Sequence, residues 1–421
     1  MQKLFAILAM IFLSVLSGIA AEPALKITVE SEPKSHLVRV NEPFAFLIDA
    51  DKPQKLKVVL SLDGEAVLKE LFVTPPARIP SVLPFPGFVR CAVTPAEGEA
   101  KPVLCAVGVD PDQLRPLLPE PPDFDAFWER TKKELAAIPP DFKMEKIGSN
   151  GTFDNYRISC ANLNGQRAYA FLALPADPSR KVPLLVTLPG WEALTCEEDF
   201  GALKSSVTGF ESARLLFHLP PYQPVKKHSE IKARHDRFLK EIGLRRYVFY
   251  KLDDRDHYYA RTGITGCIRL LEEALKQPGL DPKRVWYYGA SHGGGFGLYL
   301  AAFSDKLTAA FCGVPNFGDR GGFLAGRHVP DSNSPEYRDR KTLGNLLYFD
   351  TSYAARRIRI PVMIGVGFID LFCPPSAVYT IYNELRGPKL IFNKIRNGHG
   401  DSPPEYTPMA YLWLSKQNSD K

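Results

Sequence analysis

The residues most able to do chemistry lie at 289–293, where Gly-Ala-Ser-His-Gly places a serine between two glycines. A β-prone run precedes this stretch and a helix-forming run, residues 298–303, follows it. The pattern predicts a strand, a sharp turn and a helix, which together present a serine hydroxyl at the end of the strand. The turn needs small residues on both sides because strand and helix approach closely there. We therefore predict Ser291 as a nucleophile; an incidental serine in a glycine-rich turn is the alternative.

A nucleophilic serine needs a general base, and the base needs a carboxylate that orients it. In this kind of site the acid follows the serine along the chain and the histidine comes last. His399 lies in Asn-Gly-His-Gly, residues 397–400, after the last predicted strand, and is predicted as the base. Asp370 is the first carboxylate after the strand 361–366 and is predicted as the acid. The rival bases are His292 and His328, and the rival acids are Asp331, Glu336, Asp339 and Asp350.

The oxyanion that forms during acyl transfer needs backbone N–H donors aimed at it. We expect one donor from His292, directly after the nucleophile, and one from Trp191, in the loop after the predicted strand 182–188. The side chains of Trp191, Tyr222 and Phe372 are expected to contact the substrate, with packing in the pocket wall or core as the alternative. This chemistry needs no metal and no cofactor, and we predict neither.

Mostly apolar runs of strand length predict the sheet that positions these residues. Such runs suit a parallel sheet that is covered on both faces, with reactive residues at the carboxyl ends of its strands. Helices are expected at 259–276 and 298–303, between the strands. The fold class is therefore α/β, a doubly wound and mostly parallel sheet. The expected strands are 156–160 and 168–173, which are antiparallel, then 182–188, 213–217, 285–288, 309–314, 362–366 and 390–395.

Residues 22–110 predict a separate all-β domain, a small Ig-like sandwich, because short β-prone runs alternate there with Pro, Gly, Asn and Asp. A proline-rich joint follows, and a helix is expected to open after Asp123. We therefore divide the chain into a sandwich, 22–110, and a catalytic domain, 111–421. The sandwich is either an accessory that binds carbohydrate or a partner, or a packing domain that steadies or flanks the active site; we favour packing.

Residues 1–21 predict a cleaved secretory signal peptide, because Lys3 precedes a short apolar run and small residues follow. An uncleaved anchor is the alternative, and no later segment is apolar enough to cross a membrane. We expect a secreted or periplasmic protein. The 421 residues carry a net charge of +6, and with no nucleic-acid-binding signature they indicate no nucleic-acid partner.

Seven scattered cysteines do not form a disulfide framework or a metal-binding pattern. Cys91 and Cys105 lie in neighbouring predicted strands and could pair, with buried free thiols as the alternative. The basic stretch 224–240 is either a lip for acidic glycans or a solvated helix, and we favour the helix.

From about residue 120 to 405 the sequence resembles the acetyl xylan esterase and cephalosporin-C deacetylase family of α/β-hydrolases. The similarity lies in Pro-Asp-Phe-Asp-Ala-Phe-Trp at 122–128, in the stretch from Asp281 to Gly294, in Asp-Leu-Phe-Cys-Pro-Pro-Ser at 370–376 and in Asn-Gly-His at 397–399. The resemblance implies an α/β-hydrolase fold and a serine esterase whose nucleophile, acid and base are the three residues predicted above. The sandwich resembles the accessory domain of longer secreted bacterial relatives.

Three positions depart from the family pattern. His292 replaces the usual glutamine, Leu-Pro-Gly-Trp at 188–191 replaces His-Gly-Tyr, and residues 218–223 replace Arg-Gly-Gln. The expected activity is removal of acetyl groups from plant-type polysaccharides or oligosaccharides, with the acetylated carbohydrate as partner and an oligomer possible. The alternatives are another α/β-hydrolase, such as a glucuronoyl-type esterase or a peptidase, or a carbohydrate-binding protein without activity.

Overall fold

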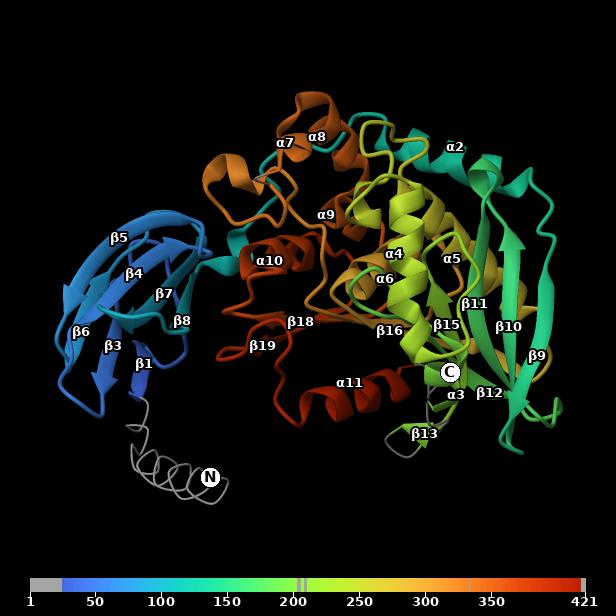
Figure 1. Ribbon diagram of the computed structural model, residues 1–421, viewed down its shortest axis with the longest axis horizontal. Coiled ribbons are helices and arrows are strands. Elements are labelled where there is room, and N and C mark those ends of the chain that lie inside the picture. Colours follow the sequence, from blue (N-terminus) through green and yellow to red (C-terminus); the bar gives the residue numbers. More distant parts are fainter. Residues whose placement is uncertain (1–24, 203–205, 208–209, 333, 418–421) are drawn as a thin grey trace, which may run out of the picture.

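The computed structural model describes residues 25–202, 206–207, 210–332 and 334–417 (Figure 1). The predicted signal peptide, residues 1–21, lies outside these ranges. Across the described ranges, no helix combines the length and the apolar character that a bilayer span requires.

Eight strands at the start of the chain form two sheets around one apolar core, at one end of the molecule in Figure 1. This is the small all-β sandwich that the sequence predicted. The strands are β1 (Ile27–Glu32), β2 (Leu37–Val38), β3 (Phe44–Ala50), β4 (Leu56–Leu62), β5 (Ala66–Val73), β6 (Ala77–Ser81), β7 (Gly87–Pro95) and β8 (Val103–Val109).

One sheet has the order β1-β3-β6 and is antiparallel, and the other has the order β2-β8-β7-β4-β5. In the second sheet, Cys91 of β7 lies opposite Cys105 of β8, and both are free, buried thiols. Strand β6 contains Pro80, which pairs with Ala45 in register. A proline is tolerated there because β6 is an edge strand with no further neighbour among the described strands.

A nine-stranded sheet follows, in the order β19-β18-β17-β16-β12-β15-β11-β10-β9. Its first six strands in that order run parallel, and the last three are added antiparallel. All eight predicted strands are present, and β9 was missed because its exposed, charged sequence gives no apolar signal. The strands are β9 (Lys143–Ser149), β10 (Phe153–Ala161), β11 (Arg167–Pro175), β12 (Val182–Leu188), β15 (Ala213–His218), β16 (Leu280–Ala290), β17 (Ala309–Gly313), β18 (Val362–Gly367) and β19 (Lys389–Lys394).

Helices cover both faces of this sheet, which explains why its central strands are apolar throughout. On one face, the largest apolar cluster joins the sheet to α2, α5, α6, α9 and α10. On the other face, α11 buries Tyr406, Ala410 and Leu414 against Trp286 and Phe311. The helices are α2 (Phe124–Ala136), α3 (Glu197–Ala202), α4 (Ile231–Glu241), α5 (Tyr259–Leu275), α6 (His292–Phe303), α7 (Pro335–Arg338), α8 (Arg340–Leu346), α9 (Thr351–Ala355), α10 (Pro375–Glu384) and α11 (Tyr406–Ser415).

The strand order brings the predicted reactive loops together. The chain leaves β12 for β15 on one side and returns to β16 on the other, so the order reverses between β12 and β16. At such a reversal the two following loops diverge and leave a crevice at the carboxyl ends of the strands. Here those loops carry Trp191 and Ser291. Asp370 follows β18 and His399 follows β19 at the same edge.

The sandwich packs directly on the nine-stranded sheet's domain. Phe88 of β7 belongs to the large core, and its ring centroid lies 5.1 Å from that of Phe368, just after β18. Figure 1 shows the sandwich beside α10, β18 and β19. Its contact surface is therefore next to the loop that carries Asp370.

Candidate active site

Ser291 occupies a strained turn between β16 and α6. Its φ of 57° and ψ of −121° lie in a region that non-glycine residues rarely adopt. A Cβ on Gly293 would lie 2.0 Å from the carbonyl oxygen of Leu188, and one on Gly289 would lie 2.9 Å from the carbonyl carbon of Gly293. The glycines on both sides of Ser291 are thus required by close backbone packing, as the sequence pattern predicted.

Asp370 and His399 meet at the ends of β18 and β19. Nδ1 of His399 lies 2.9 Å from Oδ2 and 3.2 Å from Oδ1 of Asp370, whose side chain is fully buried. Oδ1 of Asp370 also accepts from the backbone N–H groups of Phe372, at 2.8 Å, and Cys373, at 2.9 Å. These bonds keep the carboxylate oriented toward the imidazole, so that Nε2 of His399 is the nitrogen left for a reacting proton.

Ser291 and His399 line one cavity, with a volume of about 590 Å³. Trp191 and Phe372 also line it and are 64% and 61% exposed, so neither ring packs in the core. The ring of Phe372 lies 5.2 Å from that of His399. Two exposed aromatic rings beside the reacting groups can stack on a sugar ring or restrict the acyl group.

The loop after β12 lies against the predicted nucleophile, Ser291. A Cβ on Gly190 would be 3.6 Å from Cβ of Ser291. The next residue, Trp191, has a φ of 53°, in the left-handed region, so the chain turns sharply there after β12. The described residues provide no hydrogen-bond acceptor for the backbone N–H of Trp191. His292 begins α6, where the first N–H groups have no partner within the helix. Both predicted oxyanion donors are therefore next to Ser291.

The side chain of His292 ties this loop to the nucleophile's helix. Nδ1 bonds the carbonyl oxygen of Trp191, and Nε2 lies 3.2 Å from the hydroxyl of Tyr259. A neutral ring with its proton on Nδ1 satisfies both contacts, since it donates to the carbonyl and accepts from the hydroxyl. Burial lowers the pKa of His292 to about 4, which keeps the ring neutral. His292 therefore cannot serve as the base, because both ring nitrogens are occupied.

A second buried network holds the next residue of this loop, Glu192. Glu192 accepts from Nε2 of His235, in α4, and from the backbone N–H of Tyr247 at 2.9 Å. Nδ1 of His235 lies 3.0 Å from the hydroxyl of Tyr222, which is buried and outside the residues that line the cavity. Tyr222 therefore lies outside the lining of this cavity, and its hydroxyl belongs to the network that supports the loop.

The basic stretch 224–240 becomes α4 and the turn before it. Its charged residues are largely exposed, which agrees with a solvated helix, but His235 and Phe238 face inward. Composition alone predicted the exposed face. It did not predict His235, because its partner Glu192 is 43 positions away.

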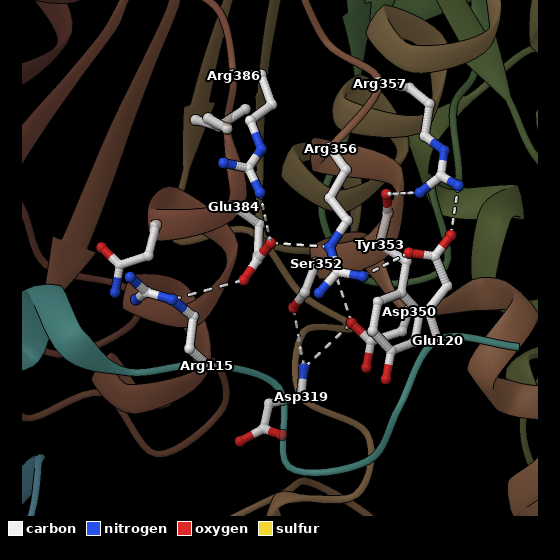
Figure 2. A network of polar contacts seen from close by, with 12 residues as sticks. Arg115, Glu120, Asp319, Asp350, Ser352, Tyr353, Arg356, Arg357, Glu384 and Arg386 are labelled. Atoms are coloured by element: carbon white, nitrogen blue, oxygen red, sulfur yellow. Dashed lines mark hydrogen bonds and ion pairs between the residues drawn. The ribbon is translucent and has the colours of Figure 1, made fainter.

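The rival acids have other roles. Asp350 is fully buried and accepts from the backbone N–H groups of Asp319 at 3.2 Å, Arg320 at 2.7 Å and Ser352 at 2.9 Å. Burial raises its pKa to about 6. Figure 2 shows Asp350 and Ser352 meeting the backbone of Asp319, beside an arginine and glutamate network. That network pairs Arg356 with Glu120 and Glu384, and Arg357 with Glu120.

The remaining rivals are also engaged. Asp339 caps α8 through the N–H of Thr342, at 2.8 Å, and Asp331 forms an ion pair with Arg246 at 2.8 Å. The side chain of Glu336 lies outside the described residues. The rival base His328 lines the cavity, but both of its ring nitrogens face other acceptors, Glu65 and Leu371.

Two groups that support the loops of Asp370 and His399 were not predicted from the sequence. Lys394, buried at the end of β19, donates from Nζ to the carbonyl oxygens of Gly398, at 3.4 Å, and Asp401, at 2.9 Å. It thereby anchors the loop of His399. Arg90, in the sandwich, donates to the carbonyl oxygen of Asp370 at 2.8 Å. A buried cation among apolar neighbours is the pattern that could have indicated each of them, but not its partner.

Two groups among the described residues could offer three ligand atoms to a metal. One contains Asp370, His399 and Cys373, but the first two bond each other, and burial raises the pKa of the Cys373 thiol well above its usual value. The other contains Cys196, Asp199 and His228, where Asp199 and His228 form an ion pair at 2.8 Å. Internal pairing satisfies most of these atoms.

Comparison with known proteins finds relatives along most of the chain. The sequence profile of the acetyl xylan esterase (AXE1) family matches residues 112–321 and 326–417. Acetyl esterase Axe7A of Xylanibacter ruminicola is 30% identical over 318 residues, which cover 74% of this chain and 70% of that protein.

Two solved structures share the fold at lower identity. Acetyl xylan esterase from Paenibacillus sp. R4 has a TM-score of 0.59 at 19% identity, covering 72% of this chain and 98% of its own. Acetyl xylan esterase 1 from Thermoanaerobacterium sp. JW/SL YS485 has a TM-score of 0.59 at 21% identity, covering 73% and 98%. The likeness shows the α/β-hydrolase fold of the larger domain.

Proposed function

This chain belongs to the acetyl xylan esterase family, a family of carboxylic ester hydrolases, and from that premise we propose that it is a serine esterase acting through Ser291, Asp370 and His399. Its substrate is an acetylated plant-type polysaccharide or its oligosaccharides. The observation that carries the assignment is the cavity shared by Ser291 and His399, with Asp370 bonded to the far side of the imidazole.

In the proposed mechanism, His399 takes the proton of Ser291 as its hydroxyl oxygen attacks the ester carbonyl carbon. The oxyanion receives hydrogen bonds from the backbone N–H groups of His292 and Trp191. His399 then gives the proton to the leaving sugar oxygen, and an acetyl group remains on Ser291. Water, deprotonated by His399, releases acetate and restores the serine. Asp370 stabilises the imidazolium in both steps and fixes its tautomer.

Trp191 and Phe372 are the proposed substrate contacts, because both rings are exposed in the same cavity. We also propose the division of the chain near residue 110, supported by the separate apolar core of the first eight strands, and export through the segment 1–21. The glucuronoyl-type esterase, peptidase and non-catalytic alternatives find no support in the family match.

The assay is acetate release from acetylated xylo-oligosaccharides, together with hydrolysis of p-nitrophenyl esters of increasing chain length. Ser291→Ala should lower kcat by about three orders of magnitude or more, because nucleophile, base and acid act as one unit. Ser304→Ala, just beyond the other end of α6, is the matched control and should keep full activity. Retention of more than a few per cent of activity in Ser291→Ala would reject the nucleophile, and a flat profile from acetate to octanoate would reject the deacetylase assignment.

A further inference from the structure

Two side chains of the N-terminal sandwich reach the loop that carries Asp370. Arg90, in β7, is 3% exposed, and its Nη2 donates to the carbonyl oxygen of Asp370 at 2.8 Å. Glu65, between β4 and β5, lies 2.8 Å from Nδ1 of His328, whose Nε2 lies 2.8 Å from the carbonyl oxygen of Leu371. Two consecutive carbonyl groups of the loop are thus tied to the sandwich, one directly and one through His328.

The contact at Arg90 is buried and carries charge. Burial lowers the pKa of Arg90, against the opposing effect of Asp63 and Asp370. Asp63, in the β4–β5 turn, is 1% exposed, and burial raises its pKa to about 6. Burying a guanidinium is costly unless its donors and charge are matched. At this interface the carbonyl of Asp370 accepts from Nη2 and the two carboxylates provide the opposite charge, while Nε of Arg90 has no hydrogen-bond partner among the described residues.

The β4–β5 turn also packs against the loop without spare space. Asp63 and Gly64 have φ of 52° and 92°, the conformation that an Asp-Gly hairpin turn favours. A Cβ on Gly64 would lie 2.4 Å from Nη1 of Arg90 and 3.2 Å from Cδ2 of Leu371. The turn therefore contacts both the residue that holds the loop and the loop itself.

The loop's backbone controls the direction of the carboxylate. Oδ1 of Asp370 is held by the N–H groups of Phe372 and Cys373, and Oδ2 faces His399. A shift of this backbone would therefore move the carboxylate relative to the imidazole. Small misplacements of catalytic groups lower turnover strongly.

We propose that Arg90 and Glu65 are positioning residues of the esterase. Through them, the N-terminal sandwich helps to hold the catalytic carboxylate of Asp370 in place. Arg90 acts on Asp370 through its carbonyl group, and Glu65 acts on Leu371 through His328. Neither residue touches the reacting atoms. The inference rests on the proposed function, in which Asp370 orients His399.

The test compares Arg90→Gln and Glu65→Ala with wild type on p-nitrophenyl acetate. We expect kcat to fall at least roughly tenfold in each variant while KM changes by less than about threefold, because the carboxylate is misplaced but the cavity remains. The acid limb of the pH–rate profile should move to lower pH, since a displaced carboxylate stabilises the imidazolium less. Arg90→Lys should recover part of the loss, because an ammonium group also donates to a carbonyl.

Glu70→Ala is the matched control, since Glu70 lies on β5 and forms an exposed ion pair with Lys57 at 3.0 Å. It should keep kcat within about twofold of wild type. If Arg90→Gln does not fold, Glu65→Ala, at a partly exposed position, decides the question. The proposal is overturned if the folded variants keep wild-type kcat and pH profile. An inactive wild-type enzyme would instead reject the proposed function, so the two failures are distinguishable.

Discussion

Replacing His292 by glutamine should make the protein more resistant to acid without removing its activity. The proposed catalytic contribution of this residue is its backbone N–H, which the substitution leaves in place. A glutamine amide can also donate to the carbonyl of Trp191 and accept from the hydroxyl of Tyr259, the two contacts of the present ring. At neutral pH we expect a change in the free energy of unfolding of no more than about 1 kcal/mol.

The acid effect follows from the pKa of His292, which burial lowers from 6.5 to about 4. Between these two pH values the unfolded chain binds a proton that the folded chain does not. Stability is therefore lost as the pH falls through 6.5 toward 4, and none is lost above this window. At about pH 4.5 the shift corresponds to roughly 2.5 kcal/mol in the free energy of unfolding. Glutamine does not titrate, so His292→Gln should not show this loss.

The measurement is urea-induced unfolding of wild type and His292→Gln at about pH 7.5 and about pH 4.5. The difference between the two proteins should change by roughly 2.5 kcal/mol between the two conditions, in favour of the variant at low pH. His257→Gln, at an exposed position, controls for loss of a histidine as such. Parallel pH dependence of wild type and His292→Gln would refute the reasoning that a buried, neutral imidazole is retained in the folded state.

Three further predictions concern the catalytic loops. Asp370→Asn should keep the fold and lower kcat by several orders of magnitude with a modest change in KM, because the amide no longer fixes the His399 tautomer. Near-normal turnover in a p-nitrophenyl acetate assay would reject Asp370 as the acid. Gly293→Ala should lower thermal stability and activity together, since its Cβ would lie 2.0 Å from the carbonyl oxygen of Leu188. Gly344→Ala is the control: open space surrounds that position, so thermal stability should stay the same or rise. Trp191→Ala should lower kcat/KM for acetylated oligosaccharides more than for p-nitrophenyl acetate. Equal losses would argue against stacking of a sugar ring on Trp191.

The sheet and the proposed catalytic residues could be predicted from the sequence because both rest on local patterns. Continuous apolar runs indicate buried parallel strands, and the glycines around Ser291 mark a turn that only small neighbours permit. Asp370 and His399 were assigned from their positions after such strands. The carboxyl ends of parallel strands share one edge of a sheet, so residues there are brought together whatever their separation along the chain.

Only the tertiary structure decided which side chains hold these residues in place. Arg90 lies 280 positions from Asp370, His235 lies 43 positions from Glu192, and His292 reaches across 101 positions to Trp191. No periodicity connects such pairs, and the local sequence around a buried histidine or arginine does not identify its distant partner. The sequence therefore determined the proposed reactive groups and the sheet edge at which they lie. Their support depends on side-chain contacts between distant segments, including the sandwich, and these form only when the whole chain packs.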